Sequence, residues 1–192
     1  NTIFFSEKKS KKFYNNAPPT GFVFFDLLDN YFISLETLIC RTKYLKKISF
    51  KFNEDFSMIS DLDLTLKLSM ICKLGYCPFV LSKWRIHPSS DSWKKKNLFF
   101  LEKLRFIEVL KIINPNLDNQ KFLKHKKNFI QQTNYSIILN KIESGEKRKE
   151  IIKEIKNKNV ESINFLILLI LTFFPFNRQI MKLYRKFFSI TP

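Results

Sequence analysis

The chain has few of the residues and motifs on which common enzyme sites are built. Its 192 residues include only 3 Gly, 3 Cys and 2 His. No glycine-rich phosphate loop, Gly-x-Ser-x-Gly nucleophile elbow or His-Glu-x-x-His zinc helix occurs in it. Several common enzyme classes are therefore poorly supported.

The three cysteines, Cys40, Cys72 and Cys77, are odd in number and include no Cys-x-x-Cys pair. This pattern argues against a disulfide framework and against a structural zinc site. The N-terminus also lacks the charged region, apolar core and small-residue cleavage site of a secretory signal. A reducing, cytoplasmic setting is therefore expected.

Acidic residues are half as frequent as basic ones, 17 against 34, which gives a net charge of +17. Such a charge suits an anionic partner: nucleic acid, a phospholipid surface or a diphosphate-linked substrate. Genome composition offers a second explanation of the positive charge. Lys, Asn, Ile and Phe are abundant, and all four have A+T-rich codons. No zinc-finger spacing, RNP-like strand or clear helix-turn-helix is present, so no nucleic-acid partner is expected.

At 45% hydrophobic and 16% aromatic residues, the chain is expected to fold and to be rich in helix. Residues 1–20 are polar and basic and predict a loop or linker. Residues 22–30 and 42–47 predict short helices, and 34–40 an extended segment. The patterns after residue 94 predict helices at 95–113, 117–140, 142–158, 160–174 and 177–189.

A longer helix is predicted from Ser60 towards Gly75, followed by a strand that leads to His87. Ser60 is a good N-cap, and Asp63 three positions later completes a capping-box pattern. Leucines fill the positions between, and Gly75 is a natural helix stop. Asp61 therefore lies in the first turn of this helix.

The C-terminal residues 160–192 combine a strongly apolar stretch, Ile163–Phe176, with a basic amphipathic one, Asn177–Ile190. The first is short for a membrane span, which needs about twenty residues. The second sets Arg178, Lys182 and Arg185 on one side of a helix, as in an interfacial helix. Association with a membrane surface is the favoured interpretation, with a packing face or a true span as alternatives.

The order of motifs from about Phe22 to Ser92 resembles the acceptor half of inverting glycosyltransferases of family 2, which have the GT-A fold. The segment that ends in Arg41, the turn at Asn53–Asp55, the Ser-Asp-Leu-Asp-Leu segment and the Arg-x-His-x-x-Ser segment follow one another as in that family. The resemblance implies an α/β fold class, a partial GT-A-like domain over residues 21–93, and a mostly helical region after it. Residues 94–159 are then a helical extension, and 160–192 a membrane-associating segment.

Two departures from the family pattern stand out. Ser60 occupies the position of the first glutamate in the family's Glu-Asp pair, and Lys67 that of a frequent arginine. The nucleotide-binding half, with its Asp-x-Asp metal motif, should precede this region, yet only about twenty residues do. The chain therefore resembles the C-terminal portion of a transferase.

The resemblance implies that Asp61 is the catalytic base, because inverting transfer needs a carboxylate that takes the proton of the acceptor hydroxyl. Helix capping and dipole stabilisation are the structural alternative for Asp61. Asp63 is a candidate substrate contact by the same resemblance, although its capping role is favoured.

His87 resembles a histidine that helps some members hold a divalent metal, Mn²⁺ or Mg²⁺, together with the missing Asp-x-Asp motif. An ordinary loop histidine is the alternative. Three further candidate substrate contacts each have a structural alternative. They are Arg85, for a diphosphate; Trp84, for sugar stacking, with core packing favoured; and Glu36, for the acceptor, with a solvated carboxylate as the alternative. His125, in a lysine-rich stretch, is expected at the surface.

The sequence thus predicts a glycosyltransferase that moves a sugar from a nucleotide-sugar donor to a glycan or lipid-linked acceptor, in bacterial surface polysaccharide synthesis. Its expected place is the inner face of the cell membrane, as a peripheral protein. The alternative is a noncatalytic basic protein that binds a membrane surface, or a degenerate remnant of an enzyme.

Overall fold

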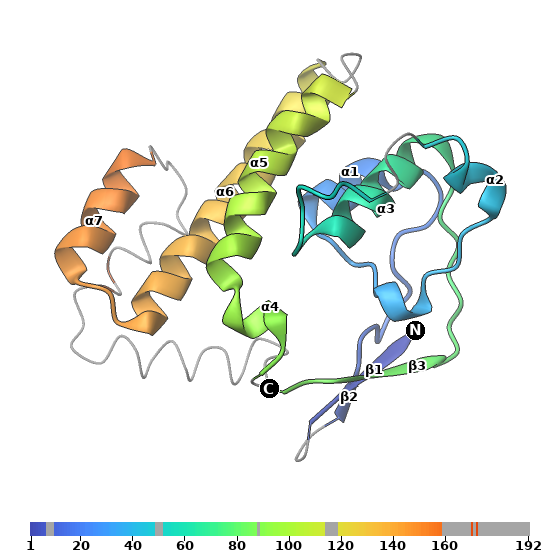
Figure 1. Cartoon of the computed structure of the whole chain (residues 1–192), viewed down its shortest axis with the longest axis horizontal. Helices are drawn as coiled ribbons and strands as arrows, with labels where there is room; N and C mark the ends of the chain where they lie inside the picture. The colour runs from blue at the N-terminus through green and yellow to red at the C-terminus, as the bar shows by residue number, and fades with distance from the viewer. Residues whose placement is uncertain are drawn as a thin grey trace. The chain divides into compact units, whose positions relative to one another are not determined.

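A computed structural model describes residues 1–6, 10–48, 52–87, 89–113 and 119–158, together with Ile170 and Thr172. These residues form a mixed α/β structure with one small sheet and several helices (Figure 1). The expected α/β class is therefore confirmed. The chain divides into two compact units, one of residues 1–126 and one that starts at Lys127.

The sheet of the first unit has the strand order β2-β1-β3, with β1 at Thr2–Phe5, β2 at Ser10–Lys12 and β3 at Ser82–Arg85. β1 pairs antiparallel with β2 and parallel with β3. Phe4 of β1 is buried. Its ring lies 4.9 Å from that of Phe13 and 5.0 Å from that of Trp84, measured between centroids.

The prediction of a loop over residues 1–20 was wrong, because this stretch supplies both β1 and β2. The alternating burial of Thr2–Phe5 is that of a strand with one covered face. The exposed residues of β2 lie at the edge of the sheet, where lysines are well tolerated. The basic composition of the stretch concealed the strand signal.

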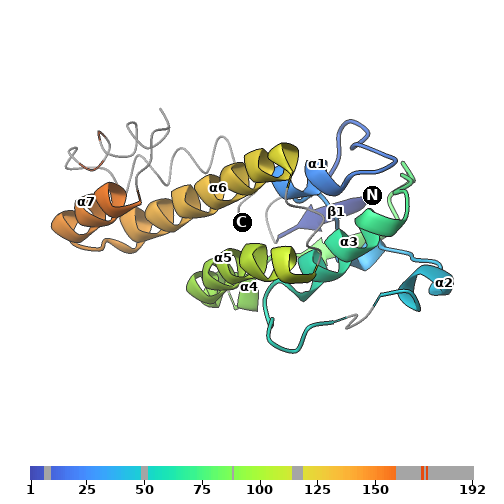
Figure 2. The same ribbon diagram turned by 90° about the horizontal axis from the view of Figure 1, so that it is seen from above.

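Helices α1 (Phe24–Asp29) and α3 (Ser60–Ile71) pack against each other in the first unit (Figure 2). The chain that enters α1 also meets the chain that leaves α3. Gly21 and Leu74 exchange two backbone hydrogen bonds, each 2.8 Å long. Gly21 has a φ of 89°, a conformation that glycine adopts without strain. The buried apolar residues of the two helices are Phe24, Leu27, Leu28, Leu62, Leu64, Leu66 and Leu68.

Shorter elements complete this part of the chain: η1 (Leu35–Thr37), α2 (Thr42–Leu45) and α4 (Asp91–Lys94). The predicted short helices at 22–30 and 42–47 are confirmed by α1 and α2. The expected extended segment at 34–40 is instead interrupted by the 3-10 turn η1. Its residues Leu38–Cys40 have no regular structure.

The long helices are α5 (Lys96–Ile113) and α6 (Gln120–Ser144), and the shorter α7 (Arg148–Asn157) follows. They confirm the first three helices predicted after residue 94. Gly145, with a φ of 77°, ends α6 and turns the chain into α7. In the second unit, α6 and α7 share a buried cluster of Ile138, Ile142, Ile151 and Ile155.

No helix among the described residues is long and apolar enough to cross a membrane. The predicted helices at 160–174 and 177–189 lie outside the described residues, apart from Ile170 and Thr172.

Candidate functional site

Asp61 lies in the first turn of α3, as predicted, and its side chain is half-buried. The helix begins one residue earlier than expected, since Ser60, the predicted cap, is its first residue and Ile59 occupies the cap position. Ile59 is fully buried, and its carbonyl accepts the Asp63 backbone N–H at 2.9 Å. The start of α3 is therefore anchored by a buried apolar side chain rather than by a polar cap.

Tyr31, in the loop after α1, contacts the Asp61 carboxylate. Its hydroxyl donates a hydrogen bond to Asp61 Oδ2 at 3.1 Å. Thr65, one turn along α3, has its Oγ1 3.4 Å from the Tyr31 hydroxyl and 2.8 Å from the Asp61 carbonyl oxygen. The three side chains form one polar group on the N-terminal half of α3.

Burial raises the pKa of Tyr31 well above its ordinary value, and the negative charge of Asp61 raises it further. Tyr31 therefore stays protonated and acts as a hydrogen-bond donor at any physiological pH. Nothing in the sequence singled it out, because a lone tyrosine in a short loop has no motif around it. Only the packing of α1 against α3 brings it to Asp61.

Asp63 has a different environment from Asp61. Its side chain is fully buried, and its Oδ2 pairs with Lys67 Nζ at 2.6 Å, where Lys67 is 5% exposed. Burial raises the pKa of the Asp63 carboxyl, and the Lys67 ammonium partly offsets that rise. The capping-box prediction was wrong, because the carboxylate points to Lys67 one turn ahead and not back to Ser60. A side chain without exposed surface also offers no direct contact to a substrate.

His87 follows β3 and is exposed. Its Nδ1 lies 2.9 Å from Ser89 Oγ, and its carbonyl accepts hydrogen bonds from both the backbone N–H and the hydroxyl of Ser90. These local bonds shape the turn that leads into α4. The Nε2 side of the ring is available to a ligand.

Trp84 and Arg85 lie on opposite faces of the sheet, because they are neighbours on β3. Trp84 is paired in register with Phe4 and packs on it at a 72° edge angle, yet remains 45% exposed. Arg85 is paired with Phe5, and its guanidinium carbon lies 5.6 Å from that ring's centroid. The two side chains therefore cannot meet one ligand on the same face.

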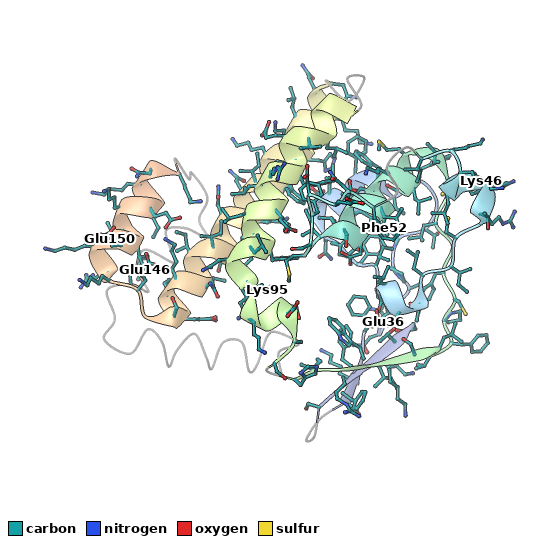
Figure 3. All side chains as sticks on the ribbon, viewed as in Figure 1. Glu36, Lys46, Phe52, Lys95, Glu146 and Glu150 are labelled. Carbon is teal, nitrogen blue, oxygen red and sulfur yellow. The ribbon has the colours of Figure 1, made fainter. Side chains whose placement is uncertain are left out.

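Glu36 lies on η1 and is exposed (Figure 3). η1 itself contacts β3, so Glu36 and Trp84 belong to one neighbourhood. No hydrogen bond or ion pair joins Asp61 to Glu36 or His87 within the described part of the chain. The predicted residues are therefore not joined by hydrogen bonds into one site: Asp61 is bonded to Tyr31, whereas Glu36 lies on an element that contacts β3.

A divalent metal would need several oxygen or nitrogen ligands at once. Among the described residues, no group of three or more His, Cys, Asp or Glu side chains is placed to hold one. His87 can supply a single ligand. The described donor set therefore does not fit a complete metal centre.

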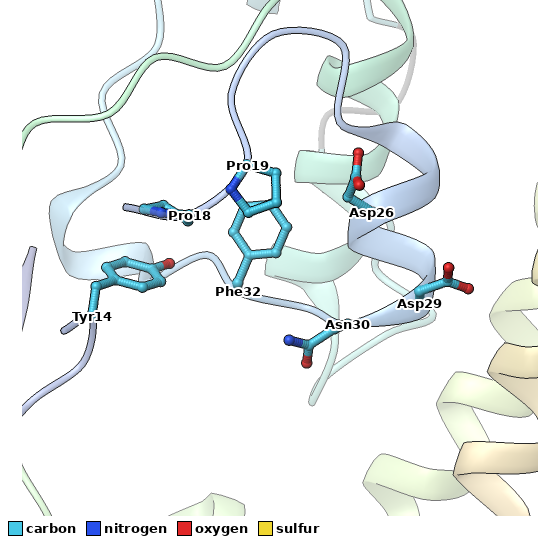
Figure 4. Close-up of a pocket in the computed structure, with 7 residues that line it drawn as sticks. All are labelled: Tyr14, Pro18, Pro19, Asp26, Asp29, Asn30 and Phe32. Carbon is cyan, nitrogen blue, oxygen red and sulfur yellow. The ribbon is translucent and has the colours of Figure 1, made fainter. Parts of the chain in front are cut away.

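A pocket of about 380 Å³ lies between residues 14–19 and the end of α1 (Figure 4). Asn30 and Phe32, the two neighbours of Tyr31, belong to its wall. Asp29, at the end of α1, lies beside His125 of α6, with 2.9 Å between Asp29 Oδ2 and His125 Nδ1. The lining residues are Tyr14, Pro18, Pro19, Asp26, Asp29, Asn30 and Phe32.

His125 was expected at the surface, and the structure places it there only in part. Its side chain is 16% exposed, and its ring lies 4.6 Å from that of Phe25 between centroids. The aromatic contact and the nearby Asp29 carboxylate together explain the partial burial of a histidine in a lysine-rich stretch.

Comparison of the chain with family models, with curated proteins and with solved structures finds no match.

Proposed function

We propose that this chain is the acceptor-side part of an inverting glycosyltransferase of the family 2 type, with Asp61 as the catalytic base. In the proposed reaction, Asp61 takes the proton of an acceptor hydroxyl. The hydroxyl oxygen forms a bond to the anomeric carbon of the donor sugar, and the bond from that carbon to the nucleoside diphosphate breaks. The donor is a nucleotide sugar, and the acceptor is a glycan or lipid-linked sugar.

The hydrogen bond from Tyr31 to Asp61 is the observation that carries the proposal. A general base must keep a fixed orientation and retain an oxygen for the proton that it removes. Tyr31 donates to Oδ2, and among the described residues no side chain donates to Oδ1. Partial exposure of Asp61 lets an acceptor hydroxyl approach. A carboxylate that served only as a helix cap would need neither the tyrosine nor the open oxygen.

The order of elements also supports the proposal. A turn at Asn53, the helix α3, the strand β3 and the His87 turn follow one another as in the family that the sequence resembles. The turn is built by Asn53, whose Oδ1 accepts the Asp55 N–H at 3.0 Å and whose carbonyl accepts the Phe56 N–H at 3.0 Å. The GT-A assignment and the inner membrane face remain parts of the proposal.

A metal in this family would balance the charge of the leaving diphosphate. His87, through Nε2, is the described residue proposed to contribute a ligand. The remaining ligands would come from the Asp-x-Asp motif that residues 1–20 do not contain. No step above depends on the metal.

The test is the turnover of the Asp61→Asn variant, measured as nucleoside diphosphate released from a panel of nucleotide sugars with source-cell membranes as acceptor. The protein is purified from its own cells, so that any further segment or partner chain is included. Asn keeps the shape of Asp but cannot take a proton, so turnover should fall by about two orders of magnitude or more.

Glu150→Gln is the matched control, because Glu150 is an exposed first-turn carboxylate of another helix, α7. Its turnover should equal that of the parent protein. Near-normal turnover of Asp61→Asn would exclude Asp61 as the base.

A noncatalytic protein that binds membrane surfaces is the second candidate, and one exposed stretch favours it. Ile39 is 89% exposed, and the exposed cations on α2 and beside its two ends follow it: Arg41, Lys43, Lys46 and Lys47. Such a mixture of apolar and basic side chains suits an anionic lipid surface.

Two measurements separate the candidates. Calorimetry with nucleotide sugars should detect donor binding only if the protein is a transferase. Flotation with vesicles that contain anionic lipid tests the membrane association expected in both cases. Deletion of residues 160–192 should release the protein from the vesicles if that segment is the anchor, whereas unchanged flotation would refute the role of that segment.

A further inference from the structure

A buried glutamate of α5, Glu102, accepts hydrogen bonds from the loop that leads into α3. The Glu102 side chain is 7% exposed. Its Oε1 accepts hydrogen bonds from the Ser57 N–H at 3.0 Å and from the Ser57 hydroxyl at 2.9 Å. Its Oε2 accepts the Met58 N–H at 2.8 Å. One carboxylate therefore satisfies three donors of two consecutive residues.

Other side chains of the same helix face hold the same loop. The rings of Phe56 and Phe106 meet edge to face, with centroids 6.0 Å apart, and both are buried. Arg105 reaches back to Asp55, with 3.1 Å between Nη2 and Oδ2. The exposed pair adds little stability, so Glu102 and Phe106 are the main anchors.

The anchored loop ends directly at Asp61. Ser57 and Met58 are followed by the buried Ile59 and by Ser60, the first residue of α3. Because a helix is stiff, a shift of this loop would move the first turn of α3 and the Asp61 carboxylate with it. A displacement of about 1 Å at a catalytic group can cost about 100-fold in rate.

We infer that Glu102 is a positioning residue that sets the place of Asp61 relative to Tyr31 and to the acceptor hydroxyl. The acceptor hydroxyl belongs to the proposed function, so this part of the inference rests on that function. The link between Glu102 and Asp61 rests on the contacts alone. A carboxylate suits the role better than an amide, because it accepts on both oxygens and has no N–H that would oppose the Ser57 and Met58 donors.

The experiment compares the parent protein with Glu102→Gln by NMR. In Glu102→Gln, an NH2 group, which is a donor, replaces one of the two carboxylate oxygens. The N–H of Ser57 or of Met58 then has no acceptor. Amide exchange at those two residues should quicken by roughly tenfold, the effect of about 1.4 kcal/mol. The carboxyl carbon signal of Asp61 should also shift. In the turnover assay, kcat should fall about tenfold or more while KM for the donor stays unchanged.

Glu108→Gln is the control on the same helix, because Glu108 is 64% exposed and pairs only at the surface, with Lys126. Glu108→Gln should leave the amide exchange, the Asp61 carboxyl signal, kcat and KM unchanged. Ser57→Ala removes a single bond to Glu102 and should shift the Asp61 signal in the same direction. Ser57→Ala replaces Glu102→Gln in the test if Glu102→Gln does not fold.

Faster exchange at Ser57 and Met58 with an unmoved Asp61 signal would overturn the inference, because Glu102 would then only stabilise the loop. The NMR readouts need no substrate. If the parent protein shows no turnover but the Asp61 signal shifts, the transferase proposal fails while the coupling of Glu102 to Asp61 stands.

Discussion

The Tyr31 hydroxyl and the Asp61 carboxylate are joined by a 3.1 Å hydrogen bond between residues 30 positions apart in the chain. The bond links the loop after α1 to the first turn of α3, two elements that pack on each other. It fixes the orientation of the carboxylate and uses one of its two oxygens. The same bond makes the state of Tyr31 a reporter of the charge on Asp61.

Replacement of Asp61 by Asn should lower the pKa of Tyr31. The negative charge of Asp61 raises that pKa in the parent protein, but burial is the larger cause. The pKa in Asp61→Asn should therefore fall and still remain above the ordinary 10.0. NMR of ¹³Cζ-labelled tyrosine measures it, and Tyr31→Phe assigns the signal. An unchanged pKa of Tyr31 in Asp61→Asn would contradict the hydrogen bond. The control variant Glu150→Gln should leave the pKa of Tyr31 unaltered.

The helix α3 was predictable because its signals are local. An apolar run follows a polar start at Ser60, and helical spacing needs no knowledge of neighbours. The role of Asp63 was not predictable, since the same spacing serves a capping box or an ion pair with Lys67. Burial decides between the two, and burial depends on which elements pack around the helix.

The contacts of Asp61 were missed for the same reason. Tyr31 and Glu102 lie 30 and 41 positions from Asp61, and neither has a motif around it. Their association depends on how α1 and α5 pack in the first unit. The strand β1 was missed because the lysines beside it resemble a linker. Sequence thus revealed the candidate base, whereas its orienting partners needed three-dimensional structure.

Loss of Lys67 should strongly destabilise the first unit. The Lys67→Met variant leaves Asp63 buried without its ion-pair partner, at a cost of about 3 kcal/mol in unfolding free energy. The double variant Asp63→Leu/Lys67→Met removes both charges and should recover most of that loss. Urea denaturation followed by circular dichroism measures the three proteins.

An exposed pair of the same spacing provides the control. Asp91 and Lys95 are also four residues apart, 2.8 Å from each other, but are 64% and 51% exposed. Lys95→Met should cost much less unfolding free energy than Lys67→Met, because water screens an exposed pair. Equal losses for Lys67→Met and Lys95→Met would mean that burial does not govern the strength of these pairs.

Lys103 on α5 should make the unfolding free energy of the protein depend on pH in the alkaline range. Burial lowers the pKa of its ammonium from 10.5 to about 8. Between these two pH values the unfolded chain binds more protons than the folded one, so the contribution of Lys103 to stability rises with pH. Below pH 8 the full cost of burying the charge is present.

The Lys103→Met variant should therefore be more stable than the parent protein at pH 7, with a difference that shrinks towards pH 10.5. Thermal unfolding at a series of pH values measures this difference. Lys124→Met, at an exposed position of α6, corrects for the loss of one positive charge. A pH-independent difference for Lys103→Met would show that its amine is not desolvated.

The pair Ile151 and Ile152 on α7 offers a comparison in which only burial differs. Ile151 is 2% exposed and belongs to the cluster with Ile138 and Ile142, whereas Ile152 is only partly buried. Both Ile→Ala changes alter helix propensity in the same way, so that effect cancels between the variants. The remaining difference is the apolar contact and the cavity left behind.

Ile151→Ala should cost about 2–5 kcal/mol, the range for removing a buried isoleucine side chain. Ile152→Ala should cost roughly half of that or less, because part of its side chain already meets water. Hydrogen exchange of the α7 amides measures both losses locally. If α7 packs on α6 through the isoleucine cluster, protection must fall mainly in Ile151→Ala. Equal falls in both variants would mean that the helix is held by its ion pairs instead, of which Lys141 with Glu154 is the closest.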